Sequence, residues 1–169
     1  MIRRILLSIA AALLATPVVA SDLIEAAADT GHLAMFLQSL RAAGMVETLK
    51  GEGPFTLFAP DDNNAFIEIE DGGFAEFLID RPRLISTLAY HLIPGKVMSS
   101  DITEARLVTT LQGSQIMISP KEGGGVELFG HYRGGPTANA ARVISADIVA
   151  SNGVIHLIDH IVRPPRPGE

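Results

Sequence analysis

The sequence contains no cysteine and few basic residues, and both shortages restrict what the protein can be. Without cysteine the chain forms no disulfide, carries no lipid on an N-terminal cysteine and uses no thiol-based mechanism. The nucleophile turn of many hydrolases, Gly-x-Ser-x-Gly, is also missing. No other catalytic set is evident from the residues, so we predict that the protein is not an enzyme.

A short apolar segment lies at the start of the chain. The pair Arg3 and Arg4 precedes an apolar run over 5–14, and small residues follow up to Ala20. This is the layout of a secretory signal peptide, so we expect the mature chain to begin at Ser21 and the protein to be secreted or periplasmic. The apolar run is too short for a spanning helix, and an uncleaved anchor is the alternative.

Acidic residues clearly outnumber basic ones in the expected mature chain. Removal of residues 1–20 takes away two arginines and no acids, which leaves 11 basic and 19 acidic residues and a formal charge of −8. Nucleic acids and anionic membranes bind basic patches, so neither is an expected partner. No second long apolar run follows, and we expect no membrane insertion after cleavage.

The remaining length is that of one domain. A chain of this size buries roughly 70% of the surface that its unfolded form exposes, so it needs no disulfide for stability. We expect the domain to span 21–163. The proline-rich residues 164–169 are predicted to be an extended, disordered tail.

Apolar spacing and capping residues predict helices on both sides of a central strand. Asp22 and Glu25 have the spacing of a capping box, and apolar residues over 33–40 repeat with the period of a helix. Asp80 is a further N-cap, for a helix that runs to about His91. The predicted helices cover 22–29, 33–43, 45–49, 74–79 and 80–91.

The central strand is followed by an abrupt change of structure. Residues 55–58 have the aromatic and β-branched content of a buried strand, and Pro60 ends it because proline has no N–H to donate. Three residues with side-chain oxygens follow, and such oxygens accept hydrogen bonds from the first N–H groups of a helix. We therefore expect Asp61, Asp62 and Asn63 to cap a helix directly after them.

From Lys96 onward, short apolar runs and glycine-containing turns replace the helical pattern. Asn-Gly at 152–153, between two apolar runs, is the strongest hairpin signal, and the polar residues 130–139 are predicted to be a loop. The predicted strands cover 96–98, 106–110, 115–119, 126–129, 142–149 and 154–158. Because helices and strands occupy separate parts of the sequence, we predict an α+β fold with a mostly antiparallel sheet.

Four blocks in this order resemble the signature segments of the fasciclin-like domain. They are Gly-Pro-Phe-Thr-Leu-Phe-Ala-Pro-Asp-Asp from Gly53 with Ala65-Phe66, Tyr-His-Leu-Ile-Pro-Gly from Tyr90, Leu-Gln-Gly from Leu111, and Asp147-Ile148 followed by Asn-Gly-Val-Ile-His-Leu-Ile-Asp from Asn152. Four blocks in order are more specific than any single motif. The chain is similar to one copy of this domain over essentially 21–165.

The resemblance implies a helix cluster packed on a β-wedge or sandwich of about seven strands, with a non-enzymatic role in adhesion. In animal members, the positions that match Tyr90, His91, Asp147 and Ile148 are associated with binding integrin receptors. This chain has no Arg-Gly-Asp, no cysteine-rich module and no tandem copy. It therefore looks like a bacterial single-domain member, and its ligand does not follow from the resemblance.

The four matching positions are the predicted partner-binding residues, and each pair also has a structural interpretation. Tyr90 and His91 can end a helix and hydrogen-bond to a strand, because an imidazole suits the negative end of a helix dipole. In ordinary strand alternation, Ile148 is a core residue and Asp147 is its solvated neighbour. Both interpretations remain open for both pairs.

His131, His156 and His160, together with Asp159, suggest a metal site at first sight. If residues 154–162 are extended, His156 and His160 lie about 13 Å apart by strand rise, too far to bind one ion together. We therefore predict no metal ligand and no cofactor.

These observations favour a monomeric binding module for adhesion outside the cytoplasm. Its expected partner is a cell-surface or matrix protein or a carbohydrate. The alternative is a small-ligand carrier or an enzyme that uses a pocket between helices and sheet. A structural envelope protein without a specific partner is a third interpretation.

Overall fold

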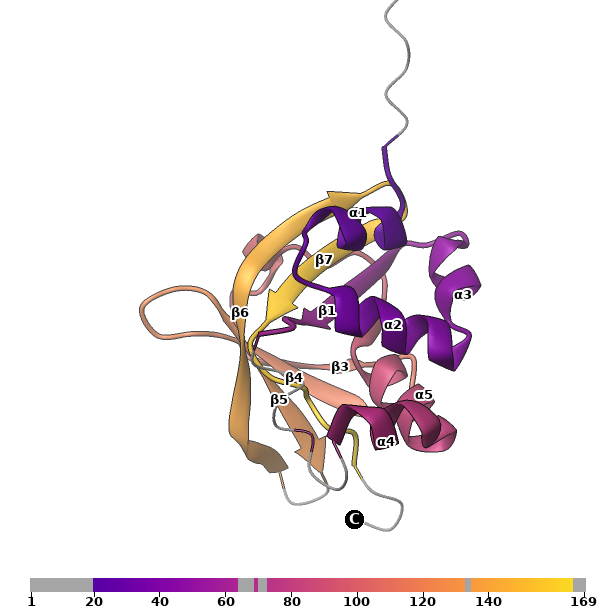
Figure 1. Ribbon diagram of the computed structural model, residues 1–169. Helices are drawn as coiled ribbons and strands as arrows, with labels where there is room; N and C mark the ends of the chain where they lie inside the picture. Colours follow the sequence, from indigo (N-terminus) through magenta and orange to yellow (C-terminus); the bar gives the residue numbers. More distant parts are fainter. Residues whose placement is uncertain (1–19, 64–68, 70–72, 133–134, 166–169) are drawn as a thin grey trace, which may run out of the picture.

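In the computed structural model, a group of helices packs on one side of a twisted, wedge-shaped sheet (Figure 1). The structure describes residues 20–63, 69, 73–132 and 135–165. For residues 131, 132 and 135–139 it describes the backbone but not the side chains. The helices are α1 (Leu23–Asp29), α2 (Ala34–Ala43), α3 (Val46–Lys50), α4 (Gly73–Ile79), α5 (Arg81–Tyr90) and the 3₁₀ turn η1 (Ser99–Asp101). The strands are β1 (Phe55–Pro60), β2 (Leu92–Pro94), β3 (Arg106–Thr109), β4 (Gln115–Pro120), β5 (Val126–Tyr132), β6 (Gly135–Ala150) and β7 (Gly153–Ile158).

The seven strands form one sheet in the order β2-β1-β7-β6-β5-β4-β3. Only the β1–β7 pair is parallel among these neighbours, so the sheet is mostly antiparallel. The long strand β6 pairs with β5 through its first part and with β7 through its second part. The predicted α+β class and the expected seven-stranded wedge are confirmed.

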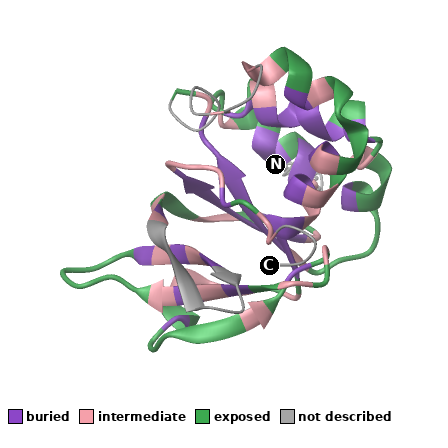
Figure 2. Cartoon of the chain, turned by 90° about the horizontal axis from the view of Figure 1, so that it is seen from below, coloured by how far each residue is buried: buried purple, intermediate pink, exposed green. Residues whose placement is uncertain are grey.

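Two hydrophobic cores lie on opposite faces of β1 and β7. Leu57 and Ile155 belong to the core beneath the helices, whereas Phe58 and Ile158 belong to the core between β1, β7 and the strands β4 and β5. All four side chains are fully buried. Figure 2 shows the same distribution, with buried residues where the helices meet the central strands and exposed residues on the outer faces. The strand predicted at 55–58 is therefore central to both cores.

Several predicted helix ends are confirmed by their hydrogen bonds. The carboxylate of Asp22 accepts from the N–H groups of Ile24 and Glu25, and that of Asp80 accepts from Arg83 N–H. Gly44 ends α2 in the left-handed conformation, with φ of 73°, which glycine adopts without steric cost. These capping residues fix where α1, α2 and α5 begin or end.

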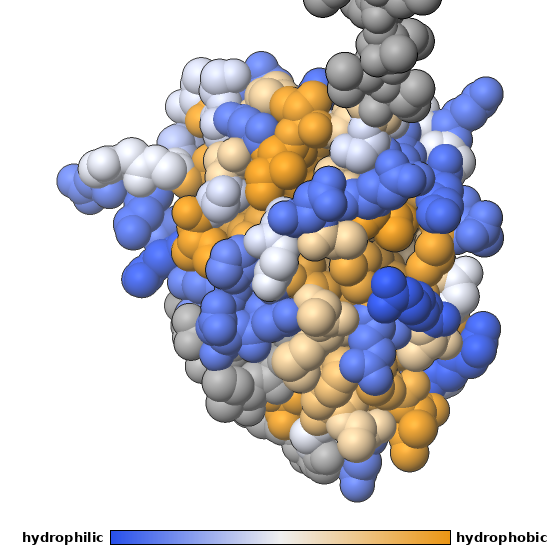
Figure 3. Space-filling view, turned by 45° about the horizontal axis from the view of Figure 1, so that its top comes forward, coloured by the Kyte–Doolittle hydropathy of each residue, from blue (hydrophilic) through white to orange (hydrophobic). Residues whose placement is uncertain are grey.

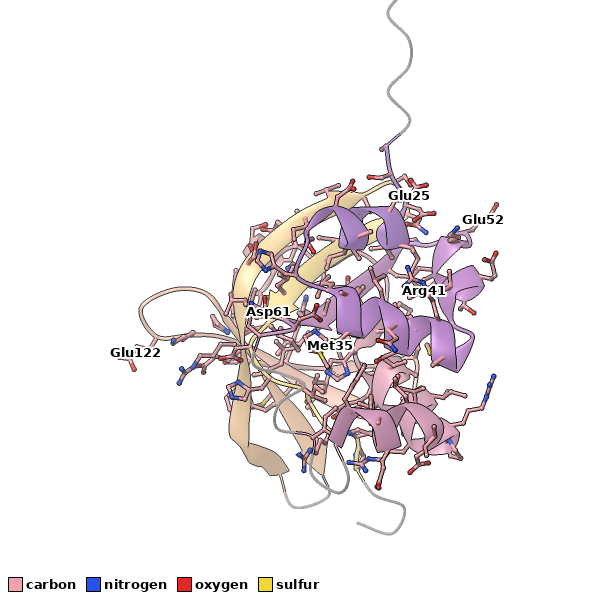
Figure 4. All side chains as sticks on the ribbon, viewed as in Figure 1. Glu25, Met35, Arg41, Glu52, Asp61 and Glu122 are labelled. Atoms are coloured by element: carbon pink, nitrogen blue, oxygen red, sulfur yellow. The ribbon has the colours of Figure 1, made fainter. Side chains whose placement is uncertain are left out.

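The structure corrects the expected role of Asp62. Its two carboxylate oxygens accept from Ala34 N–H at 2.6 Å and Met35 N–H at 3.0 Å, so it caps α2 from 28 residues away along the chain. Leu33, the residue before α2, has no oxygen to do so. Asp61 accepts from Asn63 N–H and lies near the start of α2 (Figure 4). The helix predicted after these residues falls largely outside the described residues.

One predicted strand and one predicted loop were wrong. Residues 96–98 form no strand, and the edge strand β2 lies earlier, where Leu92 pairs with Leu57 of β1. An edge strand tolerates Pro94, which the sequence had suggested as a turn. The loop predicted over 130–139 is mostly part of the paired strands β5 and β6, in which Tyr132 pairs with Gly135. Pairing between strands thus decides the structure here, although the composition is polar and contains glycine. The proposed signal peptide and the end of the tail lie outside the described residues.

Candidate partner-binding site

Tyr90, the first predicted binding residue, is the last residue of α5 and is fully buried. Its ring lies in the second core with Phe58 and Ile93. Its hydroxyl donates a hydrogen bond to the carbonyl of Gln115, at 2.7 Å, which links α5 to the start of β4. A buried hydroxyl needs such a partner, so the contact explains a tyrosine at this position.

His91 is buried and hydrogen-bonded at both ring nitrogens. Its Nδ1 lies 2.8 Å from the carbonyl oxygen of Thr87, and its Nε2 accepts from Val162 N–H at 3.0 Å. Because Nε2 is the acceptor, the ring proton is on Nδ1 and the imidazole is neutral. Burial lowers the pKa of His91 to about 4, against a weaker opposing effect of the bond to Thr87. The ring joins α5 to the segment after β7.

These contacts favour the structural interpretation for Tyr90 and His91. In the fold described, neither side chain has surface to offer a partner. Any effect of these residues on binding would have to act through the position of α5 or of the C-terminal segment. Their role in contacting a partner stays a prediction.

Asp147 and Ile148 lie elsewhere, in an irregular part of β6 that we name the β6 bend, residues 144–149. The pairing with β7 shifts register twice, between Val143 and Ser145 and between Ser145 and Ile148. Asp147 has φ of 61°, a conformation that few residues other than glycine adopt. The ordinary alternation expected here is therefore wrong, because a bulge re-aims the side chains.

The bend is held by a network around Asp147. Its carboxylate accepts from the N–H of Ser99 at 2.8 Å and from the Ser99 hydroxyl. Its own N–H donates to Nδ1 of His156 at 3.2 Å. Partial burial opposes the charged form, but the two bonds from Ser99 and the nearby His156 lower the pKa of Asp147 below its ordinary value. The carboxylate is therefore a fixed negative charge at neutral pH.

His156 anchors this network to the interior. Its Nε2 lies 2.8 Å from the carbonyl oxygen of Val97, and its ring stacks on Phe58 with centroids 5.2 Å apart. Because Nδ1 accepts from Asp147, the ring proton is on Nε2. Burial lowers the pKa of His156, although the bond to Val97 and the charge of Asp147 both act to raise it. The imidazole is thus neutral, and it packs against Phe58 of the second core.

The outward side of the bend presents apolar side chains to solvent. Ile144 is 54% exposed and Val149 is 56% exposed, whereas Ile148 is half-buried and packs against the core beneath the helices. In the space-filling view, hydrophobic side chains reach the surface between polar ones (Figure 3). Sequence reasoning missed Ile144, Val149 and Ser99. In the structure Ile144, Ser145 and Ala146 are three consecutive exposed residues, and the sequence carried no signal for this exposure.

A small crevice lies at the helix–sheet boundary. It encloses a volume of about 10 Å³, roughly the space that one water molecule needs. Its lining residues are Phe36, Pro60, Phe77, Thr87, Leu88, His91 and Ile161. Typical ligand pockets enclose about 300–1,000 Å³. The crevice therefore suits at most a very small apolar group.

The described residues include no group of three or more His, Asp or Glu side chains that could hold a metal ion. His156 is committed to the network at the bend, and Nδ1 of His160 lies 2.8 Å from the carboxylate of Asp159. The side chain of His131 falls outside the described residues.

Comparison with known proteins places this geometry in a family. A family model for the fasciclin domain matches residues 31–164, which is most of the chain. The chain belongs to the fasciclin domain family. A protein of Synechocystis sp. is 35% identical over 148 residues, which cover 86% of this chain and 75% of that protein. The expected family resemblance is confirmed.

Other fasciclin relatives are much longer proteins. Transforming growth factor-beta-induced protein ig-h3 of Sus scrofa is 33% identical over 134 residues, which cover 79% of this chain and only 18% of that protein. Periostin of Homo sapiens is 31% identical over 144 residues, which cover 85% of this chain and 15% of periostin.

A solved structure shows the same fold. It is a FAS1 domain pair from the insect cell adhesion molecule Fasciclin I, with a TM-score of 0.63 and 20% identity over 81% of this chain and 47% of that one. At this identity the likeness concerns the fold alone. Within the part of the chain described by the structure, none of the helices has the length and apolar content to cross a bilayer.

Proposed function

We propose that this fasciclin domain is a non-enzymatic adhesion module that contacts a cell-surface or matrix protein or a carbohydrate through the β6 bend. The observation that carries the proposal is the bend itself, where exposed Ile144 and Val149 flank a fixed carboxylate of Asp147. Membership of the fasciclin domain family, which the sequence resemblance associates with adhesion, supports an adhesive role for this chain as well.

The chemistry of the bend suits recognition by a protein or sugar surface. Exposed aliphatic side chains contribute by losing contact with water, and a charge that is already held in place needs no ordering when a partner binds. The network from Ser99 through Asp147 to His156 keeps the bend rigid. The bend therefore offers a partner exposed apolar surface and one carboxylate, that of Asp147, held in a fixed orientation.

The site of action in this proposal is outside the cytoplasm. The basic pair, apolar run and small residues before Ser21 support cleavage and export, to the periplasm or beyond the cell. We further propose that the mature protein acts as a monomer. N-terminal mass spectrometry and sedimentation of the exported protein test these two points, and an intact Met1 or a stable dimer contradicts them.

The binding proposal is tested with matched surface variants of the mature chain. The protein is immobilised on beads and its attachment to panels of purified matrix proteins and of glycans is measured. A double variant, Ile144→Ser with Val149→Ser, should reduce attachment at least about tenfold, since buried apolar anchors carry most interface energy. Ile79→Ser is the control, because Ile79 is 81% exposed on α4, away from the bend.

Two results contradict the proposal. One is undiminished attachment of the double variant with an unchanged circular dichroism spectrum. The other is an equal loss in the Ile79→Ser control, which indicates non-specific adsorption of apolar side chains.

Three further variants are assayed in parallel: Asp147→Asn, Tyr90→Phe and His91→Gln. If the last two change only the unfolding midpoint, Tyr90 and His91 are structural and not contact residues.

The alternative function, a small-ligand carrier or an enzyme, depends on the crevice next to His91. Its small volume does not favour that function over adhesion. Native mass spectrometry of the protein purified from its own host tests the alternative. A retained small molecule, lost on substituting Leu88 by Phe to fill the crevice, would support it.

A further inference from the structure

The side chain of Asn152, in the turn between β6 and β7, joins three separate parts of the chain. Its Oδ1 accepts from Leu23 N–H at 2.9 Å, at the start of α1. Its Nδ2 donates to the carbonyl oxygens of Leu49 at 2.7 Å and Gly51 at 3.0 Å, at the end of α3. Only a carboxamide supplies one acceptor and two donors at this position.

The next residue has to be glycine for a different reason. Gly153 pairs with Phe55 in the parallel β1–β7 ladder, and a Cβ atom on it would lie 2.2 Å from the carbonyl oxygen of Phe55. No side chain fits at that distance. The fold therefore requires asparagine followed by glycine, for independent reasons, at one turn.

Asn-Gly is also the dipeptide with the least steric protection against loss of the side-chain amide. The backbone nitrogen of Gly153 can attack Cγ of Asn152. A bond forms between them, the Cγ–Nδ2 bond breaks, and ammonia leaves with the proton of the Gly153 nitrogen. Water then opens the five-membered imide at either carbonyl and produces aspartate or isoaspartate. The step needs no oxidant, reductant or enzyme.

We propose that Asn152–Gly153 is a deamidation site that the native fold keeps closed and that opens only when the turn comes apart. For the attack, the carboxamide must leave Leu23, Leu49 and Gly51 and rotate toward Gly153. Three hydrogen bonds of ordinary net strength reduce the population of the freed carboxamide roughly a hundredfold. Pairing of Gly153 with Phe55 and Ala150 further restricts the backbone movement that ring closure needs.

Refolding does not reverse the conversion of Asn152, and the converted residue fits its place less well. An aspartate can still accept from Leu23 N–H, but its second oxygen faces the carbonyl oxygens of Leu49 and Gly51 in place of a donor. Isoaspartate also inserts an extra carbon into the backbone at the hairpin turn. A chain that unfolds for long enough thus loses the contact joining α1, α3 and β7, and it refolds to a less stable product.

The rate of amide loss at this site tests the proposal directly. The mature chain is incubated in mildly alkaline buffer, folded or unfolded in urea, and isoaspartate is measured by methyltransferase labelling and peptide mapping. A synthetic peptide spanning 148–157 in both buffers corrects for the effect of urea, and Asn139–Ala140 in the same digest is the sequence control. We expect conversion at Asn152 to be about a hundredfold slower in the folded chain, and faster than at Asn139 once unfolded.

Equal rates at Asn152 in the folded and unfolded chains overturn the proposal, as does a stable Asn152 in the free peptide. The consequence is tested with Asn152→Asp, compared with Ser151→Asp, which adds the same charge at an exposed position in the same turn. We expect a lower urea midpoint only for Asn152→Asp. An unchanged midpoint in that variant contradicts the claim that conversion at Asn152 gives a less stable fold.

Discussion

Acidification below about pH 6.5 should destabilise this protein through His91. Burial lowers the pKa of His91 to about 4 in the folded chain, from an ordinary value of 6.5. Between these values the unfolded chain binds a proton that the folded chain does not, so stability falls as the pH falls. The full difference corresponds to about 3 kcal/mol, which is a large part of the stability of a small domain.

The hydrogen bonds of His91 explain why the folded state resists protonation. A proton on Nε2 would face the N–H group of Val162, which now donates to that atom at 3.0 Å. The imidazolium would lose this bond and keep a buried charge with one carbonyl partner, at Thr87. His156, whose pKa is also lowered, adds to the loss of stability as the pH falls below its ordinary pKa of 6.5. Asp147, whose pKa is lowered as well, loses its stabilising effect only at lower pH.

Urea unfolding of the mature chain at a series of pH values measures the effect. The free energy of unfolding should fall between about pH 6.5 and pH 4, by up to about 1.4 kcal/mol per pH unit for His91. His91→Gln should flatten this dependence, and His156→Gln is the matched variant for the other histidine. In parallel, nitrogen chemical shifts should show the His91 proton on Nδ1. A pH-independent free energy over this range, or a proton on Nε2, refutes the reasoning.

Three substitutions test other contacts. Asp62→Ala should lower stability by about 1 kcal/mol through loss of the α2 cap, and urea midpoints measure it. Tyr90→Phe should lower stability by about 1 kcal/mol in the same assay without changing the circular dichroism spectrum, because the bond to Gln115 is lost while the ring is kept. Gly153→Ala should cost more than about 3 kcal/mol or prevent folding, because its Cβ would clash with Phe55, and the yield of folded protein measures this.

Local signals in the sequence were sufficient for the helices and the last hairpin. Asp22 and Asp80 cap the helices that directly follow them, and the hairpin signalled by Asn152-Gly153 forms, with Ser151 and Asn152 as its turn residues and Gly153 already paired with Ala150. These features depend on residues within a few positions of one another. Asp62 shows where such reasoning ends, because its partners Ala34 and Met35 are close only after the chain has folded.

The candidate site was predictable only in part, for the same reason. The family resemblance identified Asp147, but the bulge that orients it depends on Ser99 and His156, which come from other parts of the chain. Exposure of Ile144 and Val149 follows from the shifted β6–β7 register, which no local pattern encodes. Burial of Tyr90 likewise depends on the closure of β4 over α5, which its own segment does not reveal.

In this chain the signature blocks contact one another, which explains why they identify the family without identifying a ligand. Strand β1 from the first block pairs with β7 from the last, and Phe58 stacks on His156 across that pair. A change in either block therefore has to be matched in the other. Ile144 and Val149 lie on either side of Asp147-Ile148 of the last block with more than half of their surface exposed, so they can change without disturbing either core. Differences in ligand among members of the family are thus best sought at Ile144 and Val149 of the β6 bend, beside the residues by which the family is recognised.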